Sequence, residues 1–302
     1  GAVEKAVRET GLRACLAYEV SDRDGKEKAR EGIEENAAFI AAAQARDDNT
    51  IKGMFGLHAS FTISDETLEE AAYSGHKLGI GFHIHAAESQ ADQIHCESHH
   101  KMRVVERLRD FGILGRKSIA AHCVHVNEAE IRILRETGTA VVHNPQSNAN
   151  NAVGIADITG MISKGVLVGL GTDAMTVNML EEVRAAIWLQ HLRRDPSQGF
   201  MEAAQALLLN NAKIANRCFR GLGELKEGFA ADLVIIDYIP PTPLDASNFH
   251  GHLISGVSQS AVDTTIAAGR VLMEGRKLKL GIDEKEVSRK SAELAKKLWS
   301  RF

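Results

Sequence analysis

Histidines and carboxylates that could bind a metal or move protons gather in the middle of the chain. Ten of the 13 histidines lie between His58 and His143. Segment 83–88 reads HIHAAE, so His85 stands three residues before Glu88. Imidazole is the commonest metal ligand and an acid–base group near neutral pH, and a nearby carboxylate can carry protons to or from a substrate. The segment therefore predicts metal-assisted proton-transfer chemistry.

Three further segments end in residues of the same kind. Each carries them at or just past the end of a short apolar run: His122 in segment 118–125, His143 and Asn144 in segment 139–146, and Asp173 in segment 166–173. An aspartate in that place can bind a metal through one oxygen and accept a proton from water through the other. His83 shares a strand face with His85, and two interpretations stay open: a residue of the same site, or a histidine buried in the fold.

The apolar runs alternate with longer segments of helical periodicity, which predicts a parallel sheet with helical crossovers. We expect six strands: Arg13–Val20, Ile51–Ala59, Gly81–Glu88, Ser118–His125, Thr139–Gln146 and Val166–Asp173. The expected helices between them are Glu27–Ala45, Asp65–Leu78, Asp92–Arg109, Glu128–Glu136 and Ile155–Lys164. Six such units favour a (β/α) barrel, in which functional residues collect at the carboxyl ends of the strands. A doubly wound open sheet competes, but the chain has no glycine-rich phosphate loop.

The pattern changes after Asp173. Helices are expected at Leu180–Arg194 and Met201–Phe219, followed by turn-rich residues 221–228. Strands are expected at Ala231–Asp237 and Val262–Gly275, with a turn at 268–270, and a last helix at Lys285–Trp299. We therefore divide the chain into a barrel at 1–220, a small β layer at 221–282 and a C-terminal helix at 283–302.

Bulk composition excludes several classes of protein. The formal net charge of -4 argues against nucleic-acid binding, which favours a basic surface. No apolar run approaches the roughly 18 to 20 residues of a membrane span. The four cysteines stand far apart in sequence, which suits the reducing cytoplasm better than a disulfide framework. We expect a cytoplasmic enzyme with a small-molecule substrate.

The motifs H-x-x-E, A-H-C-x-H, H-N-P-x-S-N and G-T-D occur in this order on consecutive predicted strands. This series resembles the amidohydrolase superfamily, in the branch of the chlorohydrolases and guanine deaminases, and it is most similar to aminohydrolases of the SsnA type. Residues 223–237 are similar to the segment that enters the small β-sandwich of that family. The resemblance implies a (β/α)8 barrel, of which this chain supplies strands 3 to 8, together with part of the β-sandwich.

The resemblance also implies roles for individual residues. His85 and Asp173 would bind the metal, with His122 as a further ligand or as the residue that orients the bound water. Glu88, His122 and Asp173 would be catalytic, with Glu88 as the proton shuttle and Asp173 as the general base. His143, His58 and Asn144 would contact the substrate. One divalent metal is implied, zinc by preference and iron as the alternative, and related enzymes are commonly dimers.

The chain departs from the family pattern at one point. The resemblance calls for an H-x-H pair on strand 1, and no such pair precedes His83, whose context matches strand 5. We expect the sequence to be an excerpt of a longer protein, in which strands 1 and 2 precede this chain and strand 1 supplies the H-x-H pair.

The leading prediction is hydrolytic deamination of an amino-substituted heterocycle by a metal-activated water. The alternatives are a dechlorinase or amide hydrolase of the same superfamily, and a metal-free barrel that serves as a binding or scaffolding module. The cytidine-type deaminase design, which combines H-x-E with P-C-x-x-C, is absent because the chain has no P-C-x-x-C.

Overall fold

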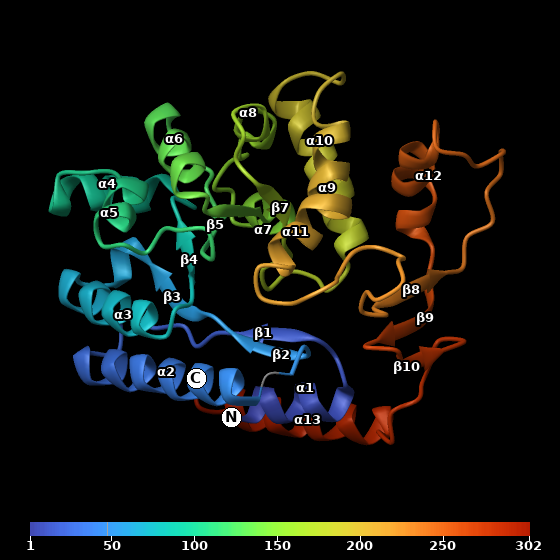
Figure 1. The fold of residues 1–302 in the computed structure, drawn as a ribbon, viewed down its shortest axis with the longest axis horizontal. Helices are drawn as coiled ribbons and strands as arrows, with labels where there is room; N and C mark the ends of the chain where they lie inside the picture. The colour runs from blue at the N-terminus through green and yellow to red at the C-terminus, as the bar shows by residue number, and fades with distance from the viewer. Residues whose placement is uncertain (47) are drawn as a thin grey trace.

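The computed structural model describes residues 1–46 and 48–302, and a series of parallel strands forms its centre (Figure 1). The first two, β1 (Ala14–Leu16) and β2 (Ile51–Gly53), pair in parallel. The next five form one parallel sheet in sequence order: β3 (Phe55–Ala59), β4 (Phe82–Ala86), β5 (Ile119–His122), β6 (Ala140–His143) and β7 (Val168–Leu170). A bridge from Val20 to Leu57 continues the pairing of the first strand along β3. The six predicted strands are therefore confirmed in position and order, with the second divided at Met54.

Helices follow the strands and cover the outer face of the sheet. They are α2 (Lys26–Arg46), α3 (Asp65–Lys77), α4 (Gln90–His100), α5 (Val104–Asp110), α6 (Glu128–Thr137), α7 (Pro145–Asn150) and α8 (Ile158–Ser163). A further helix, α1 (Ala2–Thr10), precedes β1. Ser64 caps α3 by accepting a hydrogen bond from the Thr67 backbone, as its sequence predicts.

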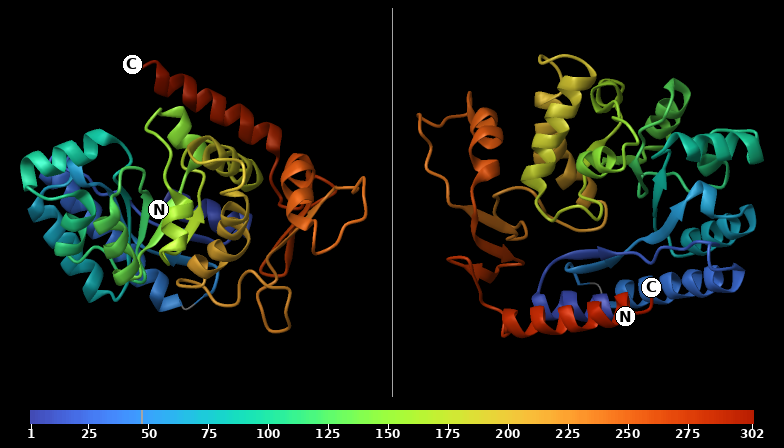
Figure 2. Two further views of the ribbon diagram at one scale, coloured as in Figure 1. Left: turned by 90° about the horizontal axis from the view of Figure 1, so that it is seen from above. Right: turned by 180° about the vertical axis from the view of Figure 1, so that it is seen from behind.

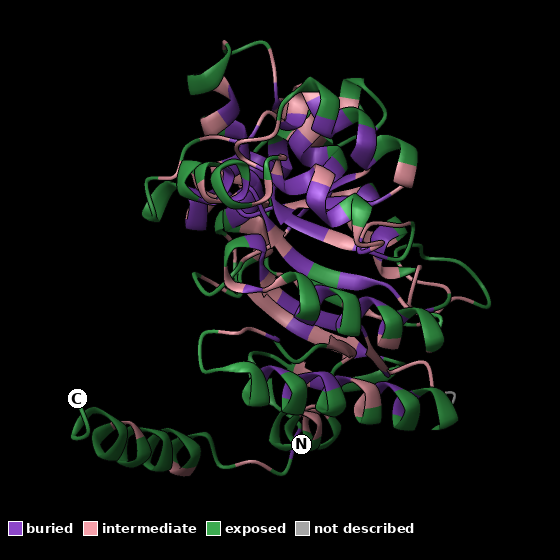
Figure 3. Cartoon of the chain, turned by 90° about the vertical axis from the view of Figure 1, so that its left-hand side faces the viewer, coloured by how far each residue is buried: buried purple, intermediate pink, exposed green. Residues whose placement is uncertain are grey.

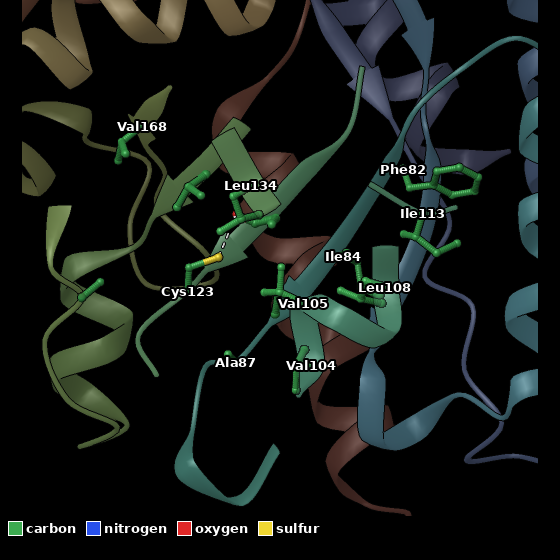
Figure 4. Packing of buried hydrophobic residues seen from close by; sticks show 14 of the residues in the cluster. Phe82, Ile84, Ala87, Val104, Val105, Leu108, Ile113, Cys123, Leu134 and Val168 are labelled. Carbon is green, nitrogen blue, oxygen red and sulfur yellow. Dashed lines mark hydrogen bonds between the residues drawn. The ribbon is translucent and has the colours of Figure 1, made fainter. Parts of the chain in front are cut away.

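The two faces of the sheet differ in burial, as β4 shows. Phe82 and Ile84 point outward and are buried: Ile84 lies beside Val105 and Leu108 of α5, and Phe82 lies beside Ile113 (Figure 4). Successive side chains of a strand alternate between faces, so His83 points inward, and it is exposed. Surrounding protein atoms nevertheless lower the pKa of His83 to about 4 by desolvation, so both interpretations of His83 stay open. The hydrophobic core lies between the strands and the outer helices.

The C-terminal part forms a second, smaller sheet beside the barrel strands (Figure 2). Before it come α9 (Met179–Arg193), α10 (Phe200–Gln205), a π-helical turn (Ala206–Asn210) and α11 (Asn211–Ala215). The sheet is antiparallel and is built from β8 (Leu233–Ile236), β9 (Val262–Ala267), β10 (Arg270–Glu274) and β11 (Lys277–Leu278). An ion pair of 2.6 Å between Arg13 and Asp232 ties it to the barrel. The expected strand at 262–275 is thus a hairpin that turns at the expected place.

Two last helices complete the chain. The first, α12 (Phe249–Ser255), packs beside the small sheet, and the sequence did not predict it. The second, α13 (Glu284–Trp299), agrees with the predicted final helix and has no buried residue, so it projects from the body of the molecule (Figure 3). Among the residues that the structure describes, no helix combines the length and the apolar character that a membrane crossing requires. The proposed boundaries at 220 and 282 stay predictions.

The single helix expected at Asp92–Arg109 is wrong, because two helices occupy that range. Lys101 adopts a left-handed backbone with φ of 59° and ends α4. A new helix then begins at Val104, where the Glu106 carboxylate accepts a hydrogen bond of 2.9 Å from the Arg103 backbone. The apolar periodicity continues across this break, which explains why the pattern alone missed it.

Candidate active site

The carboxyl ends of the parallel strands hold a cluster of residues with unusual backbone conformations. Four non-glycine residues there have φ between 49° and 69°: Ala87, His122, Cys123 and Asp173. Such left-handed conformations are costly for residues with a side chain, and they tend to gather at functional sites. The strain is concentrated at the edge of the sheet where the sequence predicted the chemistry.

His122, at the end of β5, lies at the centre of this cluster. Its Nε2 atom is 3.8 Å from the nearest oxygen of Glu88 and 3.8 Å from the nearest oxygen of Asp173. Its Nδ1 atom lies 2.8 Å from Oδ1 of Asn148. The imidazole is fully buried, and Nε2 has no hydrogen-bond partner. The structure thus brings the three predicted catalytic residues together.

Helix α7 holds all three of these residues in place. Ser147 donates a hydrogen bond of 2.6 Å to Asp173, Asn148 contacts His122, and Asn151 donates one of 3.2 Å to Glu88. Pro145 at the first position of the helix fixes its start directly after β6. The sequence motif around this proline was recognised, but the role of its polar side chains was not.

The pKa of Asp173 lies below its usual value. Partial burial would raise this pKa. The hydrogen bond from Ser147, the electrostatic interaction with His122 and the hydrogen bond from the Ala174 backbone N–H together outweigh that effect. Hydrogen bonds donated to the ionised form stabilise it. Asp173 is therefore ionised near neutral pH and can accept a proton or bind a cation.

His85 and His58 stand side by side at the ends of β4 and β3. Nδ1 of His85 lies 2.6 Å from the backbone oxygen of His58, so this nitrogen carries the proton and Nε2 keeps its lone pair. The His85 ring is 5.5 Å from the His122 ring and 5.4 Å from the His58 ring. Nδ1 of His58 lies 2.7 Å from Oγ1 of Thr62. Burial lowers the pKa of His58. His85 is therefore oriented as metal-binding histidines commonly are.

His143 and Asn144 lie behind His122 and are buried. Burial, with a smaller contribution from the nearby His122, lowers the pKa of His143 to about 3, so this imidazole is neutral. Its Nε2 atom is buried without a partner, and its Nδ1 atom lies 3.4 Å from Nδ2 of Asn148. The side chain of Asn144 reaches to 3.5 Å from Nδ1 of His122. Asn144 therefore lies next to His122, and His143 lies next to Asn148.

The donors at the site fit a divalent cation only in part. Across residues 1–46 and 48–302, no group of three or more histidine, cysteine or acidic side chains is arranged to hold a metal ion, so His85, His122 and Asp173 do not close such a site by themselves. Asn148 accepts from Nδ1 of His122, which leaves the lone pair of Nε2 facing two carboxylates. That arrangement is repulsive unless a positive charge, from a proton or a cation, lies nearby. Nitrogen and carboxylate donors of this kind suit zinc.

Glu182, which no sequence pattern singles out, is buried on α9 beside the cluster. Its Oε2 atom accepts a hydrogen bond of 3.2 Å from the Gln146 backbone at the start of α7, and its Oε1 atom is buried without a partner. Burial, reinforced by the negative charges of Glu181 and Asp173, raises its pKa to about 7. Glu182 therefore anchors the helix that carries Ser147 and Asn148.

The parallel barrel strands and the acid–base residues at their carboxyl ends define a (β/α)-barrel hydrolase. The model of the Amidohydrolase family matches residues 1–272, and the chain belongs to this family. It is 34% identical to a 5-methylthioadenosine/S-adenosylhomocysteine deaminase of Dictyoglomus thermophilum, over 97% of this chain and 70% of that protein. It is 33% identical to a 5'-deoxyadenosine deaminase of Methanosarcina mazei, over 98% of this chain and 69% of that protein.

A solved structure supports the fold. The crystal structure of an adenosine deaminase from Xanthomonas campestris with bound zinc matches with a TM-score of 0.85 at 23% identity, over 98% of this chain and 68% of that one. The predicted superfamily and the predicted (β/α)-barrel class are therefore confirmed, and the similar proteins are deaminases, as expected.

Proposed function

We propose that this chain is the catalytic barrel of an aminohydrolase that removes the amino group from the adenine ring of 5'-substituted adenosines. The observation that carries the proposal is the convergence of Glu88 and Asp173 on Nε2 of His122, each at 3.8 Å. Two carboxylates and an imidazole at one point supply the proton transfers that hydrolytic deamination needs. The names of the similar proteins supply the substrate class.

Asp173, Glu88 and His122 each have a separate role in the proposed reaction. Asp173, ionised at neutral pH, accepts a proton from the attacking water. The proton that Asp173 accepts passes to the adjacent ring nitrogen. Glu88 moves the other water proton to the amino group, so the C–N bond breaks, ammonia leaves and the ring carbon keeps the oxygen. When Nε2 of His122 carries a proton, it stabilises the negative charge that develops on that oxygen, and its burial strengthens this interaction. His143, His58 and Asn144 stay predicted substrate contacts.

We infer that His85 and Asp173 hold a divalent metal, zinc by preference and iron as the alternative, with His122 at its edge. A cation bound there supplies a Lewis acid that makes water easier to deprotonate. The orphaned Nε2 of His122 between two carboxylates supports this inference.

The test combines metal content with ammonia release. The purified protein is analysed for zinc and iron and incubated with 5'-deoxyadenosine, 5'-methylthioadenosine and S-adenosylhomocysteine, with guanine as a comparison. About one metal per chain and ammonia from an adenosine, both lost in Asp173→Asn, would support the proposal. The control is Asp110→Asn at the exposed end of α5, which should change neither quantity. Ammonia release that survives in Asp173→Asn would refute it.

One observation favours a second candidate, a metal-free binding module: the described residues do not close a three-ligand group. Protein that binds an adenosine without holding metal or releasing ammonia would establish that alternative. The assignment to the SsnA type, a homodimeric state and a cytoplasmic location stay predictions.

A further inference from the structure

A small cavity lies at the opposite end of the barrel strands from the candidate active site. It has a volume of about 200 Å³, and its lining includes Gly81 and Lys117, which come just before β4 and β5. Lys52, Arg217 and Cys218 line it as well. A thiol therefore shares this cavity with three cationic side chains.

A second thiol lies against the first. Cys15 is the central residue of β1 and pairs in register with Lys52 of β2, which lines the same cavity as Cys218. The chain after α11 packs on this strand, because the Arg13 guanidinium lies 5.5 Å from the Phe219 ring centroid. Cys15 and Cys218 consequently lie close enough for their thiol groups to interact electrostatically.

Two hydrogen bonds hold the segments that carry these cysteines together. The Asn49 side chain donates to the backbone oxygen of Arg220 and accepts from its backbone N–H, each at 2.9 Å. The contact between the thiols is therefore part of a fixed packing arrangement between β1, β2 and the residues that follow α11. Both thiols are partly accessible to solvent.

The surroundings make the two thiols chemically unequal. The interaction with the Cys15 thiol lowers the pKa of Cys218 to about 7 against the opposing effect of burial, with help from the charges of Lys117, Arg217 and Lys52. The same interaction, together with burial, raises the pKa of Cys15. The three cationic side chains that line the cavity with Cys218 thus favour the thiolate form at Cys218 over Cys15. Thiolates, not thiols, are the reactive nucleophiles.

We propose that Cys218 and Cys15 form a modification site for hydroperoxides, with Cys218 as the attacking thiol and Cys15 as the thiol that completes a disulfide. No role at this end of the barrel follows from the aminohydrolase function. The site depends on packing between residues far apart in sequence, which is why the cysteine spacing did not reveal it.

The chemistry balances with a hydroperoxide as the oxidant. The Cys218 thiolate attacks one peroxide oxygen, the O–O bond breaks, and the other oxygen leaves with a proton as water or an alcohol. Cys218 is then a sulfenic acid. The Cys15 sulfur attacks the Cys218 sulfur, the S–O bond breaks, water leaves and the disulfide forms. Two thiols lose two electrons, and the hydroperoxide gains them.

The experiment treats the folded protein at pH 7 with one equivalent of hydrogen peroxide and analyses its peptides by mass spectrometry. We expect a peptide that joins Cys15 to Cys218, reversible by dithiothreitol. In Cys15→Ser, a sulfenic acid on Cys218 should be trapped by dimedone, and in Cys218→Ser no joined peptide or sulfenic acid should form. Cys96 and Cys123 are internal controls, because both are buried and burial raises the pKa of each.

Alkylation supplies a second measurement that does not depend on disulfide formation. Iodoacetamide at pH 7 should modify Cys218 at least about tenfold faster than Cys15, since only the thiolate reacts. Lys52→Met should slow the modification of Cys218 and leave the folded state intact, because Lys52 is partly exposed. Equal rates at Cys15 and Cys218, or peroxide treatment that leaves both thiols free, would overturn the proposal.

Discussion

Asn148 offers a sharp test of how the candidate site is organised. Its Oδ1 atom lies 2.8 Å from Nδ1 of His122, whereas Nδ2 of Asn144 lies 3.5 Å from the same nitrogen. The shorter contact decides the arrangement: Nδ1 of His122 donates to Asn148, and its Nε2 presents a lone pair to Glu88 and Asp173. Asn148 thereby fixes which nitrogen of His122 carries the proton.

Replacing Asn148 by alanine should therefore cost stability and disturb the tautomer. His122 and Asn148 are both fully buried, so Nδ1–H would lose its partner out of reach of bulk water. Leaving such a donor unsatisfied costs about 1–3 kcal/mol. We expect the free energy of unfolding in urea to fall by that amount and the nitrogen resonances of His122 to change in NMR spectra.

Asn150→Ala is the matched control, because Asn150 lies on the same helix but is exposed. Both substitutions change helix propensity equally, and the control should stay within about 0.5 kcal/mol of the parent protein. In an active protein, Asn148→Ala should lower kcat more than it changes KM. Equal stabilities of the two variants, with unchanged His122 resonances, would refute the reasoning.

Three further predictions concern buried residues of the barrel: Glu182, Arg107 and Gly56. In Glu182→Gln the free energy of unfolding should become increasingly higher than that of the parent as pH rises from 5 to 8. A carboxyl whose pKa is about 7 in the folded protein and 4.5 in a free side chain destabilises the folded state over that range, by about 3 kcal/mol at most. A pH-independent difference in urea unfolding would contradict this. Arg107→Met should lower the free energy of unfolding by about 3–5 kcal/mol. The buried guanidinium donates hydrogen bonds to the backbone oxygens of Ser60 at 2.6 Å and Ile63 at 2.8 Å, and to the Asp65 carboxylate at 2.7 Å. Arg109→Met, at an exposed position, should have little effect. Gly56→Ala should lower the melting temperature strongly, since its new methyl group would lie 2.2 Å from the backbone oxygen of Tyr18. Gly251→Ala meets no atom within 4 Å and should be tolerated.

The sequence by itself determined the order of strands and the chemistry at their ends. Short apolar runs rich in small and β-branched residues identify buried parallel strands, and each predicted strand is present. Because parallel strands end at one edge of a sheet, His122, Asp173 and Glu88 could be predicted to converge before any distance was known. These features depend on local patterning, which a single sequence contains.

Tertiary structure alone decided which side chains support that site. The hydrogen bonds of Ser147 and Asn148, the burial of Glu182 and the contact between Cys15 and Cys218 join residues from different elements. Their sequence separations carry no periodic signal, so only packing reveals them. The same holds for the break at Lys101, where one left-handed residue divides a continuous apolar pattern into two helices. Local pattern thus determines the elements and their ends. The contacts that set side-chain pKa values and thiol reactivity arise only when distant elements pack together.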